Sequence, residues 1–296
     1  MNLPVVSGLI DNSAPSVETA PAFVLTGASV AASFAATGAR CRSIWSKSMT
    51  PLASKNVVII GASRGVGRAI ARRMAAEGAH VLAVGRSPTS LELLTRELPG
   101  TKTLAVDATA ETAPASVFAA QRPDLLVLCG GAIPPGRSIH ELTWEEFAVN
   151  WETDVRISFM FCREALRLPL SSGTVVILIS SGAALGGSPI SGGYAGAKRT
   201  QMFIANYAQK ESDRLELGLR FLALAPARIM PDTELGRFAV EGYARYLGIS
   251  PAEFVAGMNS RQTPEDVANA TAELATHLAD YSGSIFTISG EGIAPA

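Results

Sequence analysis

Short, uninterrupted apolar runs alternate along this chain with stretches in which apolar residues recur every three or four positions. The first pattern is typical of strands buried on both faces of a parallel sheet, and the second is typical of helices with one buried face. The predicted strands are residues 57–60, 80–85, 103–106, 125–129, 174–179, 221–224 and 284–288. The predicted helices are one from Val66 that Gly78 ends, then 91–98, 115–121, 144–168 and 194–215, with further helical turns between the last two strands.

Strands that alternate with helices predict an α/β fold, with a doubly wound parallel seven-stranded sheet in a single domain over residues 54–296. In such sheets, ligands bind at the carboxyl ends of the strands. We therefore expect the residues at these ends to converge on one crevice. They are Gly61, Gly85, Asp107, Gly130, Ser181 and Pro226.

Residues 1–53 differ from the rest, because they are rich in small residues, poor in charge and without a sustained period. We interpret them as a poorly ordered N-terminal extension. Two alternatives stay open. Met49 could be the working start, or the segment could be an organelle transit peptide, which Arg40 and Arg42 favour and Asp11 opposes.

Composition narrows the classes of function. The 296 residues are 48% hydrophobic and 17% charged, with a net charge of -1 and no basic cluster with interleaved aromatic residues, so we expect no nucleic-acid partner. No apolar run is long enough for a membrane span. The three cysteines and three histidines are scattered, which predicts no disulfide framework, no metal site and a cytoplasmic location.

A glycine-rich turn with the spacing G-x-x-x-G-x-G lies between the strand at 57–60 and the following helix. Glycines allow close approach of the backbone to a ligand, and a helix start offers unpaired N–H groups to an anion. This strand, turn and helix favour binding of a dinucleotide pyrophosphate over a plain tight turn. The residues expected to contact the ligand are Gly61, Ser63, Arg64, Gly65, Val66 and Gly67.

Tyr194 and Lys198 are four residues apart, so one face of a helix presents both. A phenol has a pKa of about 10, and a nearby ammonium in a partly dry crevice lowers it toward neutrality, as acid/base chemistry requires. Ser181 stands at a strand end thirteen residues earlier and could hold a substrate carbonyl. The alternative is a buried tyrosine beside a solvated lysine, with a serine that merely forms a turn. Competing hydroxyls are Ser180, Ser188 and Ser191.

Taken together, these motifs resemble the short-chain dehydrogenase/reductase family of the one-domain Rossmann type. The resemblance covers about residues 54–296 and rests on the glycine loop, Asp107, Ser181, Tyr194 and Lys198 in that order. It implies hydride transfer between a nicotinamide cofactor and a carbonyl or alcohol. It also implies that Tyr194 is the general acid/base, that Ser181 orients the substrate oxygen and that Lys198 holds the nicotinamide ribose.

The resemblance extends the expected cofactor site beyond the glycine loop. Asp107 would meet the adenine ring, with Ala108 beside it. The other contacts that we expect are Gly130, Gly131, Tyr194, Lys198, Pro226 and Ile229. The loop after the fourth strand departs from the family's Asn-Asn-Ala-Gly pattern, because it contains Cys129 and two glycines. Backbone contacts to the cofactor remain possible there, whereas the asparagine side-chain contacts do not.

Asp154 is the departure with the largest expected consequence. The family places an asparagine near the catalytic lysine, and the helix register puts Asp154 there, with Asn150 a candidate one turn too early. A carboxylate at 154 would favour a charged Lys198 and raise the Tyr194 pKa. A protonated Asp154 would instead mimic asparagine, and a helix-surface charge is the structural alternative.

The choice of cofactor depends on two arginines. An acidic residue at the end of the second strand would bind the ribose hydroxyls of NAD(H), but this chain has Arg86 there, and Arg64 could reach the same place. Guanidinium groups suit a 2′-phosphate, so NADP(H) is favoured over NAD(H). Both arginines could also be ordinary surface charges.

The leading hypothesis is an NADP(H)-dependent carbonyl reductase or alcohol dehydrogenase with a small-molecule substrate. Residues 229–261 would shape the substrate pocket, with side chains that indicate a lipophilic substrate or simply pack the core. The candidates to line it are Pro231, Thr233, Leu235, Phe238, Tyr243, Phe254 and Met258. By family likeness we expect a homodimer or homotetramer formed through the two long helices. The residues that offer apolar surface for this assembly are Phe159, Met160, Phe161, Met202 and Phe203. The rival hypothesis is a non-catalytic or weakly active NADP(H) sensor with the same fold, which Asp154 and Gly130-Gly131 favour.

Overall fold

The computed structural model describes residues 52–168, 170–258, 261–281 and 283–296. The interpretations of residues 1–51 as a poorly ordered extension, a late start or a transit peptide lie outside the described residues. Leu52, within the stretch predicted to be poorly ordered, is buried against the core.

Within the described residues, eight strands form one sheet in the order β3-β2-β1-β4-β5-β6-β7-β8. The strands are β1 (Asn56–Ile60), β2 (His80–Gly85), β3 (Lys102–Ala105), β4 (Leu125–Leu128), β5 (Val175–Ile179), β6 (Arg220–Pro226), β7 (Ile285–Ser289) and β8 (Gly292–Pro295). The first seven pair in parallel, which confirms the α/β class, and β8 pairs antiparallel with β7. The prediction of seven strands is wrong by one, because β8 is short, contains Gly292 and Pro295 and has no apolar run.

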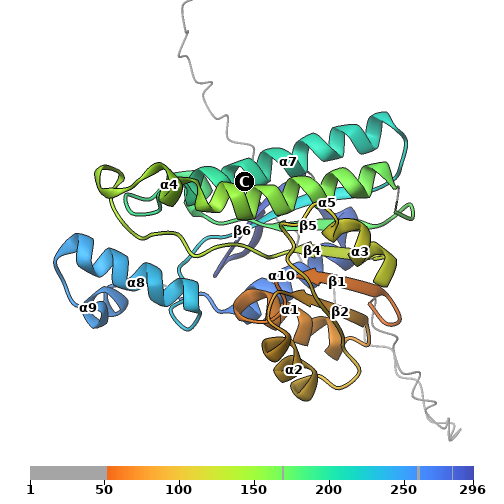
Figure 1. Ribbon diagram of the computed structural model, residues 1–296, viewed down its shortest axis with the longest axis horizontal. Coiled ribbons are helices and arrows are strands. Elements are labelled where there is room, and N and C mark those ends of the chain that lie inside the picture. The colour runs from red at the N-terminus through yellow and green to blue at the C-terminus, as the bar shows by residue number, and fades with distance from the viewer. Residues whose placement is uncertain (1–51, 169, 259–260, 282) are drawn as a thin grey trace, which may run out of the picture. The chain divides into compact units, whose positions relative to one another are not determined.

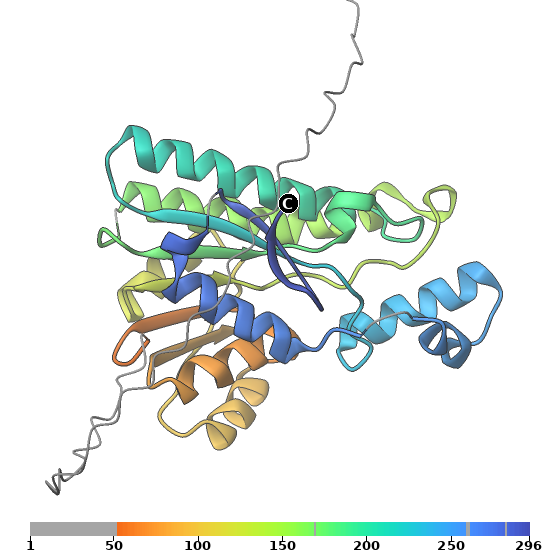
Figure 2. The same ribbon diagram turned by 180° about the vertical axis from the view of Figure 1, so that it is seen from behind.

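Helices cover both faces of the sheet (Figures 1 and 2). The helices are α1 (Gly65–Ala76), α2 (Pro88–Glu97), α3 (Ala113–Ala120), α4 (Trp144–Asn150), α5 (Arg156–Arg167), α6 (Ala183–Gly186), α7 (Tyr194–Arg214), α8 (Glu234–Leu247), α9 (Pro251–Ala256) and α10 (Pro264–Thr276). Short 3₁₀ turns occur at Ile139–Glu141 and Leu278–Asp280. None of the described helices combines the length and the apolar character needed to cross a membrane.

Two apolar layers hold the sheet between these helices. Val57 and Ile59 of β1 face the layer that contains α1 and α10, whereas Val58 and Ile60 face the layer of α5 and α7. This alternation follows from the two-residue period of a strand, and burial on both faces explains why the strands read as continuous apolar runs.

The helix predicted over residues 144–168 is interrupted. Between α4 and α5, the segment η2 (Trp151–Val155) forms a π-helical turn, which is wider than an α-helical turn. Asn150 and Asp154, at its start and within it, are both fully buried. Such turns add a residue inside a helix and frequently occur at functional sites. Here the turn keeps two polar side chains on the inner face.

Helices α8 and α9 project beside the layered body, at the end of the sheet where the strands finish (Figures 1 and 2). Helix α8 begins at its N-cap Thr233, whose Oγ1 accepts a hydrogen bond from the Gly236 amide at 2.9 Å. It ends at Gly248, which takes the left-handed conformation (φ +70°) that is common after helices. Helix α8 therefore supplies a separate wall to the site at the strand ends.

Candidate active site

A single cavity of about 510 Å³ lies at the carboxyl ends of the strands. Every residue that the sequence nominated for catalysis or cofactor binding lines it. These are Gly61, Ser63, Arg64, Gly65, Val66, Gly67, Arg86, Asp107, Ala108, Gly130, Gly131, Asp154, Ser181, Tyr194, Lys198, Pro226 and Ile229. The topology thus brings together residues far apart in the chain.

The glycine loop and the loop after β4 meet at the point where the strand order reverses. Gly61 has φ +85°, and a Cβ atom there would lie 2.7 Å from Cα of Gly130. Residue 61 therefore cannot carry a side chain unless the backbone at Gly130 moves. Helix α1 starts at Gly65, and the Arg64 side chain does not cap it. The Gly67 amide of the first turn donates to the Cys129 sulfur, and the start of the helix is otherwise suited to an anion. This cradle fits a dinucleotide pyrophosphate.

The ends of β2 and β3 carry the groups expected at the adenosine part of the cofactor. Arg86 is exposed at the cavity edge. The Asp107 carboxylate accepts hydrogen bonds from the backbone N–H and the hydroxyl of Thr109, at 3.0 and 2.8 Å. These bonds, with a smaller contribution from the charge of Arg86, lower the Asp107 pKa. Asp107 therefore organises its own turn as well as lining the cavity.

Tyr194 opens helix α7, and Lys198 follows one turn later on the same side, with Nζ 5.5 Å from the centre of the tyrosine ring. Burial raises the Tyr194 pKa, while the Lys198 charge and a hydrogen bond with the Ser181 hydroxyl act in the opposite direction. Of the four candidate serines, Ser181 is the one that reaches the phenol. Ser180 instead donates to the Lys198 carbonyl at 2.8 Å.

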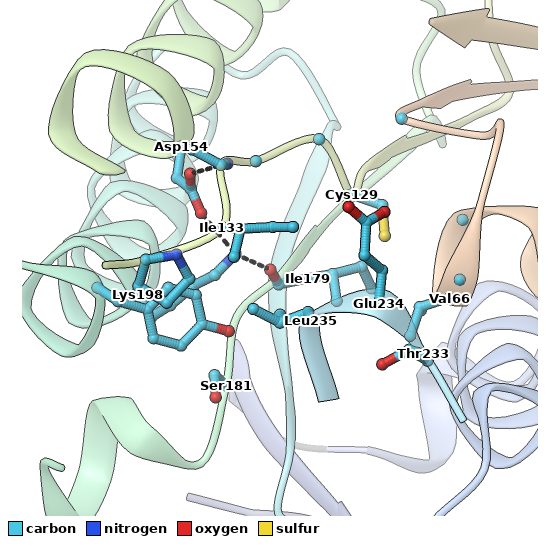
Figure 3. A pocket seen from close by; sticks show the side chains of 18 of the residues that line it. Val66, Cys129, Ile133, Asp154, Ile179, Ser181, Lys198, Thr233, Glu234 and Leu235 are labelled. Atoms are coloured by element: carbon cyan, nitrogen blue, oxygen red, sulfur yellow. Dashed lines mark hydrogen bonds and ion pairs between the residues drawn. The ribbon is translucent and has the colours of Figure 1, made fainter. Parts of the chain in front are cut away.

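Asp154 forms an ion pair with Lys198. Its Oδ2 lies 3.1 Å from Lys198 Nζ, which also donates to the Ile179 carbonyl at 3.0 Å (Figure 3). Burial alone would lower the Lys198 pKa. The negative charge of Asp154, the charge of an ionised Tyr194 and the hydrogen bond with Asp154 together outweigh the burial, so the pKa is raised. The same carboxylate is among the groups that raise the Tyr194 pKa.

Asn150, set aside in the sequence as one turn too early, joins this arrangement. Its Nδ2 donates to the Ala132 carbonyl at 2.8 Å and to Asp154 Oδ1 at 3.2 Å, and the Ala132 amide donates to the same Oδ1 at 2.9 Å. The π turn thus ties both side chains to the loop after β4. Asp154 contacts the lysine directly, and Asn150 positions Asp154.

Gly131 is required by this packing. A Cβ atom on it would lie 2.6 Å from Asp154 Oδ2. We expect Gly131→Ala to displace the carboxylate and to lower the free energy of unfolding by about 1–3 kcal/mol, as measured by urea denaturation. The control is Gly186→Ala, where the space is open. Equal stability of the two variants would contradict the tight contact.

The segment expected to shape the substrate pocket lines part of the cavity. Of the nominated residues, Thr233, Leu235, Phe238 and Tyr243 line it, whereas Pro231, Phe254 and Met258 do not. The Tyr243 hydroxyl donates to Ser188 Oγ at 2.6 Å and so joins α8 to the loop after α6. Other uncharged residues that line the cavity include Ile133, Pro134, Gly136, Ile190 and Ala239.

A comparison with protein families identifies this architecture. The profile of the short-chain dehydrogenase family matches residues 55–239. The chain belongs to the short-chain dehydrogenase family. This agrees with the resemblance inferred from the glycine loop, Ser181, Tyr194 and Lys198.

The names of the curated relatives of this chain refer to different substrates. It is 28% identical over 187 residues to a 3beta-hydroxysteroid dehydrogenase of Mediterraneibacter gnavus, covering 58% of this chain and 65% of that protein. It is 28% identical over 132 residues to an L-xylulose reductase of Bos taurus, covering 44% and 54%. A 3-oxoacyl-(acyl-carrier-protein) reductase of Rickettsia bellii is 27% identical over 248 residues, covering 82% and 98%. The match thus spans less than two thirds of the first two relatives and nearly all of the third.

Sequence reasoning missed two charged residues of this cavity, Arg228 and Glu234. Glu234 lines the cavity and forms an ion pair with Arg64. The N-cap pattern of a threonine before Glu234 would have placed it in the first turn of a helix. Nothing local could have paired it with the glycine loop, which is 170 residues away in the chain.

Proposed function

We propose that this protein is an NADP(H)-dependent oxidoreductase that interconverts a carbonyl compound and the corresponding alcohol. The observation that carries the proposal is the position of Tyr194, with Ser181 and Lys198, in the same cavity as the glycine loop. A proton donor and an anion cradle in one cavity are what a carbonyl reduction by a dinucleotide requires. A panel of aldehydes, ketones and alcohols, followed by NADPH absorbance, tests it.

A nicotinamide cofactor held in this cavity would supply the hydride chemistry at the substrate carbon. The Ser181 hydroxyl donates a hydrogen bond to the substrate oxygen and orients it toward the phenol. In reduction Tyr194 gives its proton to that oxygen, and in oxidation the ionised phenol removes the proton. Lys198 stabilises the ionised phenol through its charge. Asp154 and Ile179 hold the lysine in place.

Arg86 supports NADP(H) over NAD(H), because it follows the end of β2, where an acidic side chain would bind the ribose hydroxyls of NAD(H). We expect Arg86→Asp to weaken NADPH binding by about tenfold or more, and to leave NADH binding equal or stronger, because the new carboxylate repels a 2′-phosphate and suits ribose hydroxyls. Dissociation constants from cofactor fluorescence check this. Arg199→Asp, at an exposed position on α7 that does not line the cavity, is the matched control. Unchanged discrimination would place the 2′-phosphate elsewhere.

Asp154 makes the pH dependence of the reaction testable. Its charge helps to raise the Tyr194 pKa, so removing that charge in Asp154→Asn is expected to lower this pKa. Alcohol oxidation needs the ionised phenol and therefore rises with pH. We expect its rising limb to move to lower pH in the variant, read from kcat/KM profiles. Superimposable profiles would mean that the carboxylate does not influence the proton transfer.

The assembly expected from the family also has some structural support. Phe159 on α5 and Phe203 on α7 are exposed, and Phe203 stacks on Tyr207 with ring centres 5.7 Å apart. The other nominated contact residues, Met160, Phe161 and Met202, are buried against the sheet and cannot reach a partner. We propose a homodimer or homotetramer that uses the exposed aromatic residues of these two helices.

The rival function, a sensor that binds NADP(H) without turnover, is favoured by one observation. The Lys198 ammonium already has a buried carboxylate partner, and that carboxylate opposes ionisation of Tyr194. A protein that binds NADPH but reduces no member of the panel at any pH would fit the sensor. Turnover that depends on Tyr194 would exclude it.

A further inference from the structure

Arg64 of the glycine loop is held by a carboxylate from a distant part of the chain. Its Nη1 forms an ion pair with Oε2 of Glu234, in the first turn of α8. Both residues line the cavity. The preceding residue, Thr233, faces the same loop, because a Cβ atom on Gly65 would lie 3.9 Å from its methyl group. The start of α8 is thus fastened to the start of α1 at the cavity.

The arginines that follow in α1 have other partners. Arg68 pairs with Glu97, Arg72 pairs with Glu97 and Glu265, and Arg73 pairs with Glu77. None of these three arginines lines the cavity. Arg64 is therefore the guanidinium that this end of α1 presents to a ligand. Glu234 is the acceptor that it meets there.

The Arg64–Glu234 pair is exposed enough for an anionic ligand to replace the Glu234 carboxylate on Arg64. The two side chains are 54% and 48% exposed, and water-exposed ion pairs of this kind are weak and screened. Figure 3 shows the Glu234 carboxylate pointing into the pocket, on the side of Cys129 and Val66 and away from Lys198. An anionic ligand that approaches Arg64 must therefore displace this carboxylate or sit beside it.

We infer that Glu234 is a specificity-determining residue for the cofactor, because its carboxylate competes with a 2′-phosphate for Arg64. This inference rests on the proposed function and on the expectation from the sequence that Arg64 reaches the 2′-phosphate of NADP(H). A guanidinium binds a carboxylate or a phosphate through the same fork of N–H groups, so one acceptor excludes the other. A nucleotide without a 2′-phosphate leaves the pair intact. Glu234 thus weakens the binding of NADP(H) and leaves that of NAD(H) unchanged, so it reduces the ratio of the two affinities.

The test compares wild type with Glu234→Gln. Dissociation constants are measured for NADPH and NADH by cofactor fluorescence, and for adenosine 2′,5′-bisphosphate and AMP by calorimetry. We expect the variant to bind NADPH and the bisphosphate about fivefold more tightly, and NADH and AMP with a change below about twofold. Glu241→Gln removes the same charge from an exposed position on α8 that does not line this cavity, and is expected to change none of the four.

The pairing with Arg64 is tested in a second background. In Arg64→Gln, the added Glu234→Gln change is expected to alter NADPH affinity by less than about twofold, because the competition needs the guanidinium. Equal tightening of NADPH and NADH, weaker NADPH binding, or an effect that survives without Arg64 would overturn the inference. Wild type that binds neither nucleotide would overturn both proposals, whereas the expected binding changes without any turnover would overturn the proposed function alone.

Discussion

Tyr194→Phe is expected to lower kcat for carbonyl reduction by about 10²–10⁴-fold, the usual contribution of a positioned acid/base. The variant keeps the ring and the packing at the start of α7 and loses only the proton donor. Its affinity for NADPH should change by less than about twofold, because the glycine loop and Lys198 are untouched. Initial rates with a substrate from the panel and a fluorescence titration of NADPH measure the two quantities separately.

Tyr207→Phe is the matched control, since it removes a phenol hydroxyl from an exposed position on the same helix. It should retain wild-type turnover. If Tyr194→Phe also retains it, Tyr194 is not the proton donor. If the variant loses NADPH affinity in parallel with turnover, the phenol holds the cofactor rather than the proton.

Lys198→Met is expected to lower the free energy of unfolding by about 3–5 kcal/mol, because it leaves Asp154 buried without its cation. The carboxylate is 1% exposed and lies 3.1 Å from the lysine nitrogen. Adding Asp154→Asn should recover a large part of the loss, since a neutral amide still accepts the hydrogen bond of the Ala132 amide. Urea denaturation at fixed protein concentration gives the free energies.

The control for this experiment is Lys210→Met, an exposed lysine on the same helix, whose effect should stay within about 0.5 kcal/mol. A loss below about 1 kcal/mol in Lys198→Met would show that Asp154 gains no net stabilisation from the lysine. A double variant less stable than Lys198→Met would show that the charge of Asp154 is itself needed at this position.

Much of the fold follows from local pattern. The strand at 80–85 is observed with the limits that were predicted, and the helix at Tyr194 begins at the predicted residue. Buried parallel strands read as continuous apolar runs, and their flanking glycines and prolines mark where they end. The π turn was missed because an extra residue in one turn hardly disturbs the apolar spacing of the helix around it.

The site was predictable where one element presents several of its residues together. Tyr194 and Lys198 share a helix face, and the glycine loop is contiguous, so spacing alone brings these groups together. The contact between Asp154 and Lys198 needed the family register. The contact of Arg64 with Glu234 depends on how α8 returns over the cavity, which local pattern does not encode.

Strand β8 has a consequence for how these molecules behave at high concentration. It occupies the hydrogen-bonding side of β7 that would otherwise be open, and β7 is a five-residue strand rich in β-branched residues. A free strand of that kind is a template for pairing with other chains. The outer side of β8 ends in Pro295, which lacks an N–H group to offer. We therefore expect β8 to hinder strand pairing between molecules at this edge of the sheet.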